Sequence, residues 1–153
     1  MAKTKKWEIY HIRKNKAVAY AAKVIVRERL ANLFYTIEKY FNEMNAETLH
    51  DIRISLRRVR YNMELFIMFF NKKQFMQVYK TIQSLQDLSG AVRDLDVFKE
   101  NINLLVKDRN VKVNKAVLTE AENRRNEFED KLKISLMKFI HSKTVKTFYK
   151  SVQ

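Results

Sequence analysis

Apolar residues recur along this chain at alternating steps of three and four positions, which is the spacing of one face of an α-helix. The clearest case is the stretch 49–70, whose regular apolar positions are Leu49, Ile52, Leu56, Val59, Met63, Phe66 and Phe70. The same rhythm runs through 15–41, and the polar stretch 42–46 then gives that helix an end. We therefore predict two helices, 15–41 and 47–70, joined by a short loop.

Four further helices are predicted after a break at 71–73. The apolar rhythm places them over 74–88, from about 94 to a loop at 108–110, over 113–140, and over 144–152. Ser89 and Gly90 are expected to separate the first two, because glycine readily takes the left-handed conformation that ends helices. Asp94 and Asp96 would then lie in a first helical turn, where the helix dipole favours carboxylates. The last helix is expected to cover one end of the bundle.

The composition favours an all-α fold. The 153 residues include one glycine and no proline, and sheets need turns that depend on these two residue types. Hydrophobic residues make up 46% of the chain, which is enough to build a packed core. We predict a basic N-terminal segment, 1–14, followed by a single helical bundle, 15–153, of five to six helices with a four-helix-bundle core.

Other features of the sequence indicate a cytoplasmic protein. No apolar run is long enough to span a bilayer, and the basic N-terminus lacks the apolar stretch of a secretory signal. The chain contains no cysteine, which excludes disulfides and thiol chemistry and is in keeping with a reducing compartment. No membrane partner is therefore expected.

The charge of the chain favours an anionic partner. Lys and Arg number 31 against 17 Asp and Glu, which gives a net charge of +14. Such a field attracts nucleic acid, anionic lipid or polyphosphate, and charge alone does not choose among them.

A row of basic residues follows the apolar face of the helix 47–70, about 100° further around it. We call this row the arginine ladder; its members are His50, Arg53, Arg57 and Arg60. The next acid on the row, Glu64, can pair with Arg60 but cannot neutralise the other cations. Lysine would do equally well on a face that only needs to be soluble, whereas the planar guanidinium of arginine suits phosphate oxygens. The ladder is therefore predicted to bind an anion.

Basic residues on other helices are further candidates. Lys16, Lys23 and Arg27 share a face of the first helix and would oppose the ladder if the two helices pack antiparallel. A solvated face is an equal alternative for these three. Arg124 and Lys131 share a face of the helix 113–140, where nearby acids explain them about as well as a ligand does.

Nothing in the sequence indicates catalysis. The three histidines lie far apart and have no cysteine beside them, so no zinc site is expected. His50 next to Asp51 could act as a base, but a hydrogen bond to a phosphate or a packing role is favoured. Asp94 and Asp96 could bind Mg²⁺, and here too a structural role is favoured. Without a nucleotide-binding loop or nucleophile motif, we expect no enzyme activity, no metal and no cofactor.

Two motifs resemble the signature of the CHAD family, the conserved histidine α-helical domain. The first is an H-x-x-R-x-x-x-R-R-x-R run made by His50, Arg53, Arg57, Arg58 and Arg60. The second is the R-D-L-D-V segment 93–97, which follows Gly90. The resemblance covers roughly 15–150, and where family members usually carry two helical halves this chain has one. It implies a bundle that corresponds to half of a CHAD domain and binds inorganic polyphosphate in a basic groove.

The expected function is therefore binding of a linear polyphosphate by the ladder, with Arg58 and Arg93 beside it. Two alternatives stay open: a nucleic-acid-binding protein, and a scaffold that docks an acidic partner. Against nucleic acid, the aromatic residues fall on apolar faces and the ladder lacks the Asn or Gln that reads base edges.

The single half also predicts self-association. Two copies related by a two-fold axis would rebuild a channel, with Tyr61, Leu65 and Phe69 as the contact. A location at cytoplasmic polyphosphate granules would follow from the expected ligand.

Overall fold

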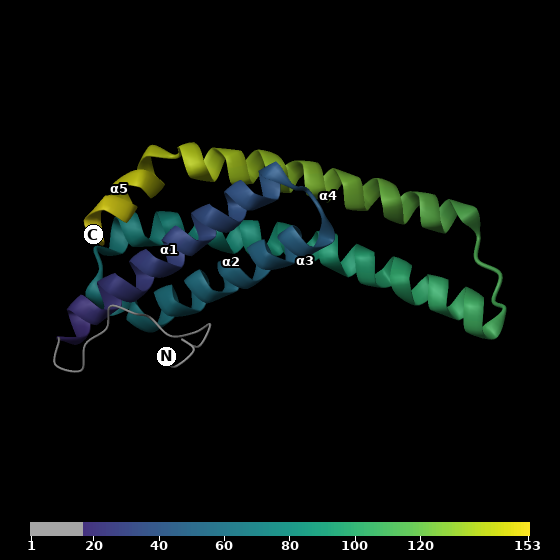
Figure 1. The fold of residues 1–153 in the computed structure, drawn as a ribbon, viewed down its shortest axis with the longest axis horizontal. Coiled ribbons are helices and arrows are strands. Elements are labelled where there is room, and N and C mark those ends of the chain that lie inside the picture. Colours follow the sequence, from purple (N-terminus) through teal and green to yellow (C-terminus); the bar gives the residue numbers. More distant parts are fainter. Residues whose placement is uncertain (1–16) are drawn as a thin grey trace, which may run out of the picture.

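A computed structural model of the chain describes residues 17–153. Within these residues the chain forms five α-helices and a short 3₁₀-helix, and no strand (Figure 1). The elements are α1 (Val18–Asn42), α2 (Ala46–Phe66), η1 (Ile67–Phe69), α3 (Lys72–Arg109), α4 (Lys115–His141) and α5 (Lys143–Ser151). The predicted all-α helical bundle is confirmed. The segment 1–14 and the candidate Lys16 lie outside the described residues.

α1 and α2 form an antiparallel hairpin with a short connection. Asn45 caps α2, since its side chain accepts a hydrogen bond from the backbone N–H of Thr48 at 2.9 Å. The Thr48 hydroxyl accepts one in return from the N–H of Asn45 at 3.2 Å. This reciprocal pair satisfies backbone groups that the first helical turn would otherwise leave without partners. Across the hairpin, Lys39 donates to Asp51 at 3.0 Å.

The prediction that Ser89 and Gly90 end a helix is wrong. α3 runs through both residues as one helix of 38 residues, and the φ of Gly90 is not positive. Leu85, Ser89 and Val92 continue the buried face across this point at steps of four and three. Packing of that face outweighs the roughly 1 kcal/mol that glycine costs in a helix interior. The helices expected over 74–88 and from about 94 are therefore one helix.

This continuity changes the position of two acids. Asp94 and Asp96 lie in the middle of α3 rather than in the first turn of a helix, so the helix dipole does not account for them. The end of α2 also differs from the prediction, because the helix stops at Phe66 and η1 follows. The remaining helix boundaries agree with the sequence pattern to within a few residues.

The core of the bundle combines the apolar faces of all five helices. Its largest fully buried side chains include Tyr40, Leu33, Ile52, Leu56, Phe75, Ile82, Phe139 and Phe148. α5 covers one end, where the ring of Phe148 lies 6.1 Å from that of Phe75 and 5.9 Å from that of Phe70. The last helix therefore covers the bundle end as predicted.

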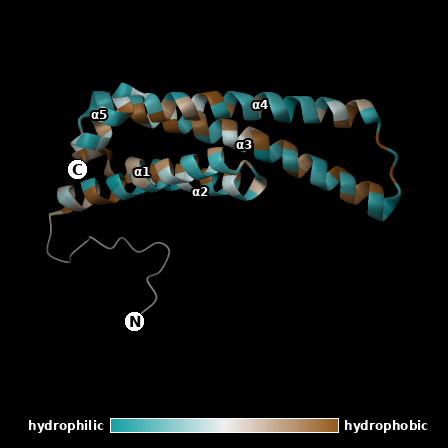
Figure 2. Ribbon diagram, turned by 45° about the horizontal axis from the view of Figure 1, so that its top comes forward, coloured by the Kyte–Doolittle hydropathy of each residue, from teal (hydrophilic) through white to brown (hydrophobic). Residues whose placement is uncertain are grey.

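The C-terminal part of α3 and the N-terminal part of α4 extend together beyond α1 and α2 (Figures 1 and 2). Apolar residues there stay in contact with water: Phe98 is 39% exposed, Leu105 41% and Val117 44%. The apolar side chains of this extension are therefore only partly covered by other helices.

A cluster of polar side chains joins three helices at the inner end of this extension. The Tyr40 hydroxyl of α1 donates to Glu129 of α4 at 2.8 Å. Arg125 of α4 pairs with Asp96 of α3 at 2.8 Å and also with Glu129. Burial, and then the hydrogen bond to Glu129, raise the pKa of Tyr40 above its ordinary value. The charged groups of this cluster therefore pair with one another, and these contacts fix the relative positions of α1, α3 and α4.

We predict that Tyr40→Phe lowers the free energy of unfolding by about 1–3 kcal/mol at neutral pH, because a hydrogen bond to a charged group is lost. Tyr35→Phe, at an exposed position of the same helix, should change it by less than about 0.5 kcal/mol. Denaturant unfolding measures both variants.

The same substitution has a pH signature. The folded state holds the Tyr40 proton above the unfolded pKa of about 10, so this contribution to stability is lost as pH rises above about 10. This part of the loss of folding stability above about pH 10 should be absent in Tyr40→Phe. Wild-type stability and an unchanged alkaline profile would contradict the assigned role.

Candidate anion-binding groove

The arginine ladder lies along the line where α2 packs against α3. Arg53 and Arg57 line a pocket with a row of α3 residues, namely Gln86, Asp87, Ser89, Gly90, Ala91 and Asp94. A second pocket is lined by Glu47, His50 and Arg53 of α2, with Ala46 and Leu49, and by Arg93 and Asp96 of α3. Because Arg53 borders both pockets, they adjoin, and we call them together the α2–α3 groove.

Gly90 leaves open space in this groove. Apart from the neighbouring backbone of α3 itself, a Cβ atom at this position would meet no atom within 4 Å. Gln86 and Asp94, one turn to either side on α3, line the same pocket. The glycine that the sequence pattern assigned to a helix end instead keeps α3 free of a side chain in the pocket that Arg53 and Arg57 line.

The cations at the centre of the groove repel one another. Burial lowers the pKa of Arg53, and the neighbouring guanidiniums of Arg57 and Arg93 lower it further, while Asp94 acts in the opposite direction. Within residues 17–153, no carboxylate oxygen lies within 4.0 Å of the guanidinium of Arg53 or Arg57. Arginine keeps its charge at neutral pH, so an anion in the groove would relieve this repulsion.

Two further arginines have acidic neighbours: Arg60 of the ladder, which lines neither groove pocket, and Arg93, which lines one. Arg60 donates to Glu64 at 2.9 Å, which confirms the predicted pairing, and it also contacts Gln86 at 3.5 Å. Arg93 pairs with Glu100 at 3.2 Å, and both side chains are well exposed. Exposed pairs of this kind contribute at most about 1 kcal/mol, so an anion can compete for both guanidiniums.

Arg58 lies outside the groove, although it belongs to the same basic motif. It lines neither pocket. The pKa of Arg29 of α1 is lowered first by burial and then by the nearby positive charge of Arg58. Arg58 is therefore on the side of α2 that faces α1.

The prediction that Lys23 and Arg27 oppose the ladder is wrong, although α1 and α2 are antiparallel as expected. Arg27 shares a helix face with Phe34, seven positions later, and Phe34 packs on Tyr149 of α5 with ring centroids 5.3 Å apart. The face of α1 that meets α2 is a different one, which carries Asn32; its side chain accepts a hydrogen bond from Ser55 at 3.0 Å. The basic row on α1 therefore lies on the side of α4 and α5.

Arg124 and Lys131 of α4 also lie outside the groove. Each pairs with an acid one turn earlier on the same helix, Arg124 with Glu120 at 2.8 Å and Lys131 with Glu127 at 2.6 Å. Neither residue lines a groove pocket. The ordinary pairing considered as their alternative role is therefore present.

Arg125 was missed by the sequence analysis, although it binds Asp96 at the edge of the groove. Its two partners come from different helices, and only the pair with Glu129, at i+4, could have been found from spacing. Within residues 17–153, no group of three or more acidic or histidine side chains is arranged to hold a metal ion. None of the described helices combines the length and apolar character needed to cross a bilayer.

A comparison with protein families gives one match. The family described as CHAD domain matches residues 2–103, about two thirds of the chain. The matched stretch contains all the residues that line the α2–α3 groove, whereas α4 and α5 lie beyond it. No curated protein and no solved structure matches the chain.

We predict opposite effects of two substitutions at Gly90. Gly90→Ala should raise the free energy of unfolding by about 0.5–1 kcal/mol, because alanine favours the helix and its Cβ meets open space. Gly90→Gln should keep the fold but place its side chain in the groove. If an anion occupies this groove, the variant should bind tripolyphosphate, used as the probe, at least tenfold more weakly. Calorimetric titration measures the binding, with Ser84→Gln, on an exposed part of α3, as the control. Undiminished binding by Gly90→Gln would show that the anion does not occupy this pocket.

Proposed function

The chain belongs to the CHAD domain family, and we propose that it binds linear inorganic polyphosphate in the α2–α3 groove without turning it over. The observation that carries the proposal is the pair Arg53 and Arg57. These guanidiniums lie side by side in a groove that Gly90 leaves open, with no carboxylate within 4.0 Å in the described chain. His50 and Arg93 extend the cationic lining at one end.

The ladder suits a long anion better than a single phosphate. From His50 to Arg60 the helix rises by about 15 Å, since each residue adds about 1.5 Å. A polyphosphate has a charge on every unit and can contact several of these cations at once. Each phosphate that replaces condensed counterions adds to the affinity, and the affinity then depends strongly on salt.

Binding without catalysis is the simplest role for these side chains. The groove offers three arginines and His50 to phosphate oxygens. Its lining also includes four acids, Glu47, Asp87, Asp94 and Asp96, of which Asp96 is engaged by Arg125. Asp94 remains near Arg53, where it limits the local positive charge. The preference over nucleic acid rests on the ladder itself, which has no Asn or Gln to read bases.

We also propose that two copies associate and that the protein works in the cytoplasm, at polyphosphate granules. Tyr61 and Leu65, on α2, are 56% and 69% exposed and could form the contact. Phe69 is a weaker candidate, because it lies in η1 and its ring centroid is 6.4 Å from that of Phe66.

A competition experiment tests the proposed ligand. We expect labelled long-chain polyphosphate to be displaced by unlabelled polyphosphate at much lower concentration than by duplex DNA, RNA or heparin of equal charge. The affinity should fall steeply between two salt concentrations. Equal displacement by DNA would contradict the proposal and favour a nucleic-acid-binding protein.

The double variant Arg53→Gln with Arg57→Gln tests the site. Two lost charge-assisted hydrogen bonds, at about 1.5–3 kcal/mol each, should weaken polyphosphate binding about a hundredfold or more. Helix content and the melting temperature should stay close to wild type, since the change removes like charges from one face. Arg124→Gln with Lys131→Gln removes the same charge outside the groove, and an equal loss in this control would mean that only net charge matters.

Light scattering tests the proposed association. Two highly positive subunits repel each other, and a polyanion in the groove reduces that repulsion. We therefore expect a dimer that is favoured by polyphosphate of defined length and disrupted by Leu65→Glu. A monomer under both conditions would contradict the proposed dimer and leave an open groove on each chain.

A further inference from the structure

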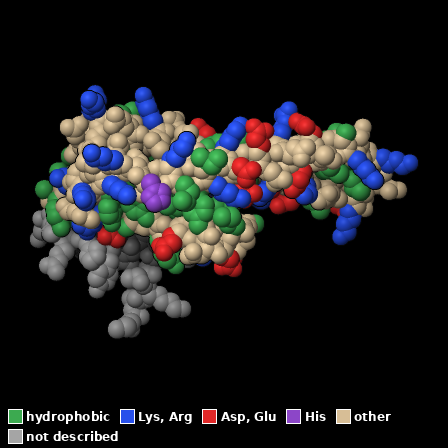
Figure 3. Space-filling model, turned by 90° about the horizontal axis from the view of Figure 1, so that it is seen from above, with side chains coloured by type: hydrophobic (Ala, Val, Ile, Leu, Met, Phe, Trp, Pro, Cys, Tyr) green, Lys and Arg blue, Asp and Glu red, His purple; other side chains and the backbone are tan. Residues whose placement is uncertain are grey.

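The C-terminal stretch of the chain that ends in α5 is basic and contains no Asp or Glu. In the stretch 134–153, the charged side chains are Lys138, Lys143, Lys146 and Lys150. Within residues 17–153, none of the four forms an ion pair. Figure 3 shows basic side chains over this end of the molecule, whereas most of the acidic side chains visible on that face lie further along it.

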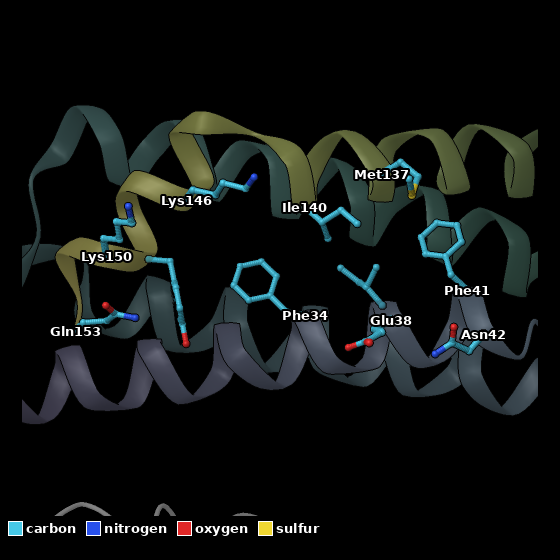
Figure 4. A pocket seen from close by; sticks show the side chains of 11 residues that line it. Phe34, Glu38, Phe41, Asn42, Met137, Ile140, Lys146, Lys150 and Gln153 are labelled. Carbon is cyan, nitrogen blue, oxygen red and sulfur yellow. The ribbon is translucent and has the colours of Figure 1, made fainter.

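An apolar pocket opens beneath two of these lysines. It lies between α1, α4 and α5 and has a volume of about 730 Å³ (Figure 4). Its apolar walls are made by Phe34, Ile37, Phe41, Met137, Ile140 and Tyr149. In Figure 4, Lys146 extends from α5 toward Ile140, and Phe34 lies across the opening from Ile140. Glu38, Asn42 and Gln153 complete the polar lining.

We propose that this pocket binds an amphiphile with one acyl chain and an anionic head group. The chain would lie against Phe34, Phe41 and Ile140, and the head group between Lys146 and Lys150, which are one helical turn apart. Apolar chains gain free energy when they leave water for such walls. The volume is within the usual range of small-ligand pockets.

The charges around the pocket select the head group. Lys146 and Lys150 have flexible side chains with compact charges, so they can meet a carboxylate or a phosphate monoester at the pocket mouth. Glu38, on the α1 side, reduces the positive charge of the two lysines but leaves the pocket mouth positive. A free polyphosphate has no apolar part to contact the walls, and a neutral amphiphile has no negative charge to pair with the lysines.

This site is independent of the α2–α3 groove. Phe34 and Phe41 lie on the face of α1 toward α4 and α5, and the two sites share no lining residue. One chain is therefore expected to bind an amphiphile and a polyphosphate at the same time, each at its own site. The inference does not depend on the proposed function.

Calorimetric titration of the full chain with dodecyl phosphate, below its micelle concentration, tests the site. We expect saturable binding of one molecule per chain, and at least tenfold weaker binding of inorganic phosphate and of the uncharged dodecyl maltoside. Binding of phosphate as tight as that of dodecyl phosphate would overturn the role of the pocket. Equal binding of dodecyl maltoside would overturn the role of the lysines.

Two sets of variants locate the ligand. Lys146→Glu with Lys150→Glu should weaken dodecyl phosphate binding at least tenfold, whereas Lys138→Glu with Lys143→Glu, an equal charge change outside this pocket, should alter it less than twofold. Met137→Trp, at a position that is 42% exposed, should fill the pocket and abolish binding without loss of helix content.

The result that overturns the proposal is equal weakening by both lysine pairs, or full binding by Met137→Trp. The variant Arg53→Gln with Arg57→Gln should bind dodecyl phosphate like the wild type. A parallel loss of amphiphile binding in that variant would place the ligand in the α2–α3 groove and also overturn the proposal.

Discussion

The repulsion between neighbouring guanidiniums on α2 is the constraint around which this structure is best understood. Arg53 and Arg57 are one helical turn apart, Arg53 half-buried and Arg57 exposed. α2 cannot rotate to move them away from α3, because its apolar face is fixed in the core. Ile52, Leu56 and Val59 of that face are fully buried. Burial of such side chains stabilises the fold by about 1.5–3 kcal/mol each, which is enough to hold like charges together on the adjoining face. The helix therefore presents a row of cations whose spacing is set by the fold, and the proposed anion would meet these charges without a rearrangement of α2.

The partly buried arginines are of two kinds: some pair with carboxylates and maintain the fold, and others, such as Arg53, have no carboxylate partner among the described residues. Arg125 is surrounded by Asp96 and Glu129, and Tyr40 satisfies the same carboxylate of Glu129. Removing one partner from such a partly buried group leaves an uncompensated charge, so this cluster is structural. Arg53 is also partly buried, yet its strongest electrostatic neighbours are other arginines. That contrast, rather than the total charge of the chain, distinguishes the α2–α3 groove from the rest of the basic surface.

The sequence predicted most of the helices and the ladder, because both depend on spacing within one helix. The pair of Arg60 and Glu64 was predictable for the same reason. Gly90 was misjudged because local propensity favours a helix end, whereas the buried face of α3 continues through it. The orientation of Lys23 and Arg27 depends on which face of α1 meets α2, and spacing cannot give the rotation of one helix relative to another.

Tertiary contacts also explain what the sequence analysis missed. The partner of Arg125 on α3 is 29 residues away, and the pocket under α5 needs α1, α4 and α5 together.

The most direct test of the central claim is to follow the arginine side-chain Nε–Hε signals by NMR while tripolyphosphate is added. The account predicts that the signals of Arg53 and Arg57 shift first and most, that Arg93 follows, and that Arg124 and Arg125 stay in place. Uniform shifts of all arginines, or shifts confined to arginines outside the α2–α3 groove, would contradict it.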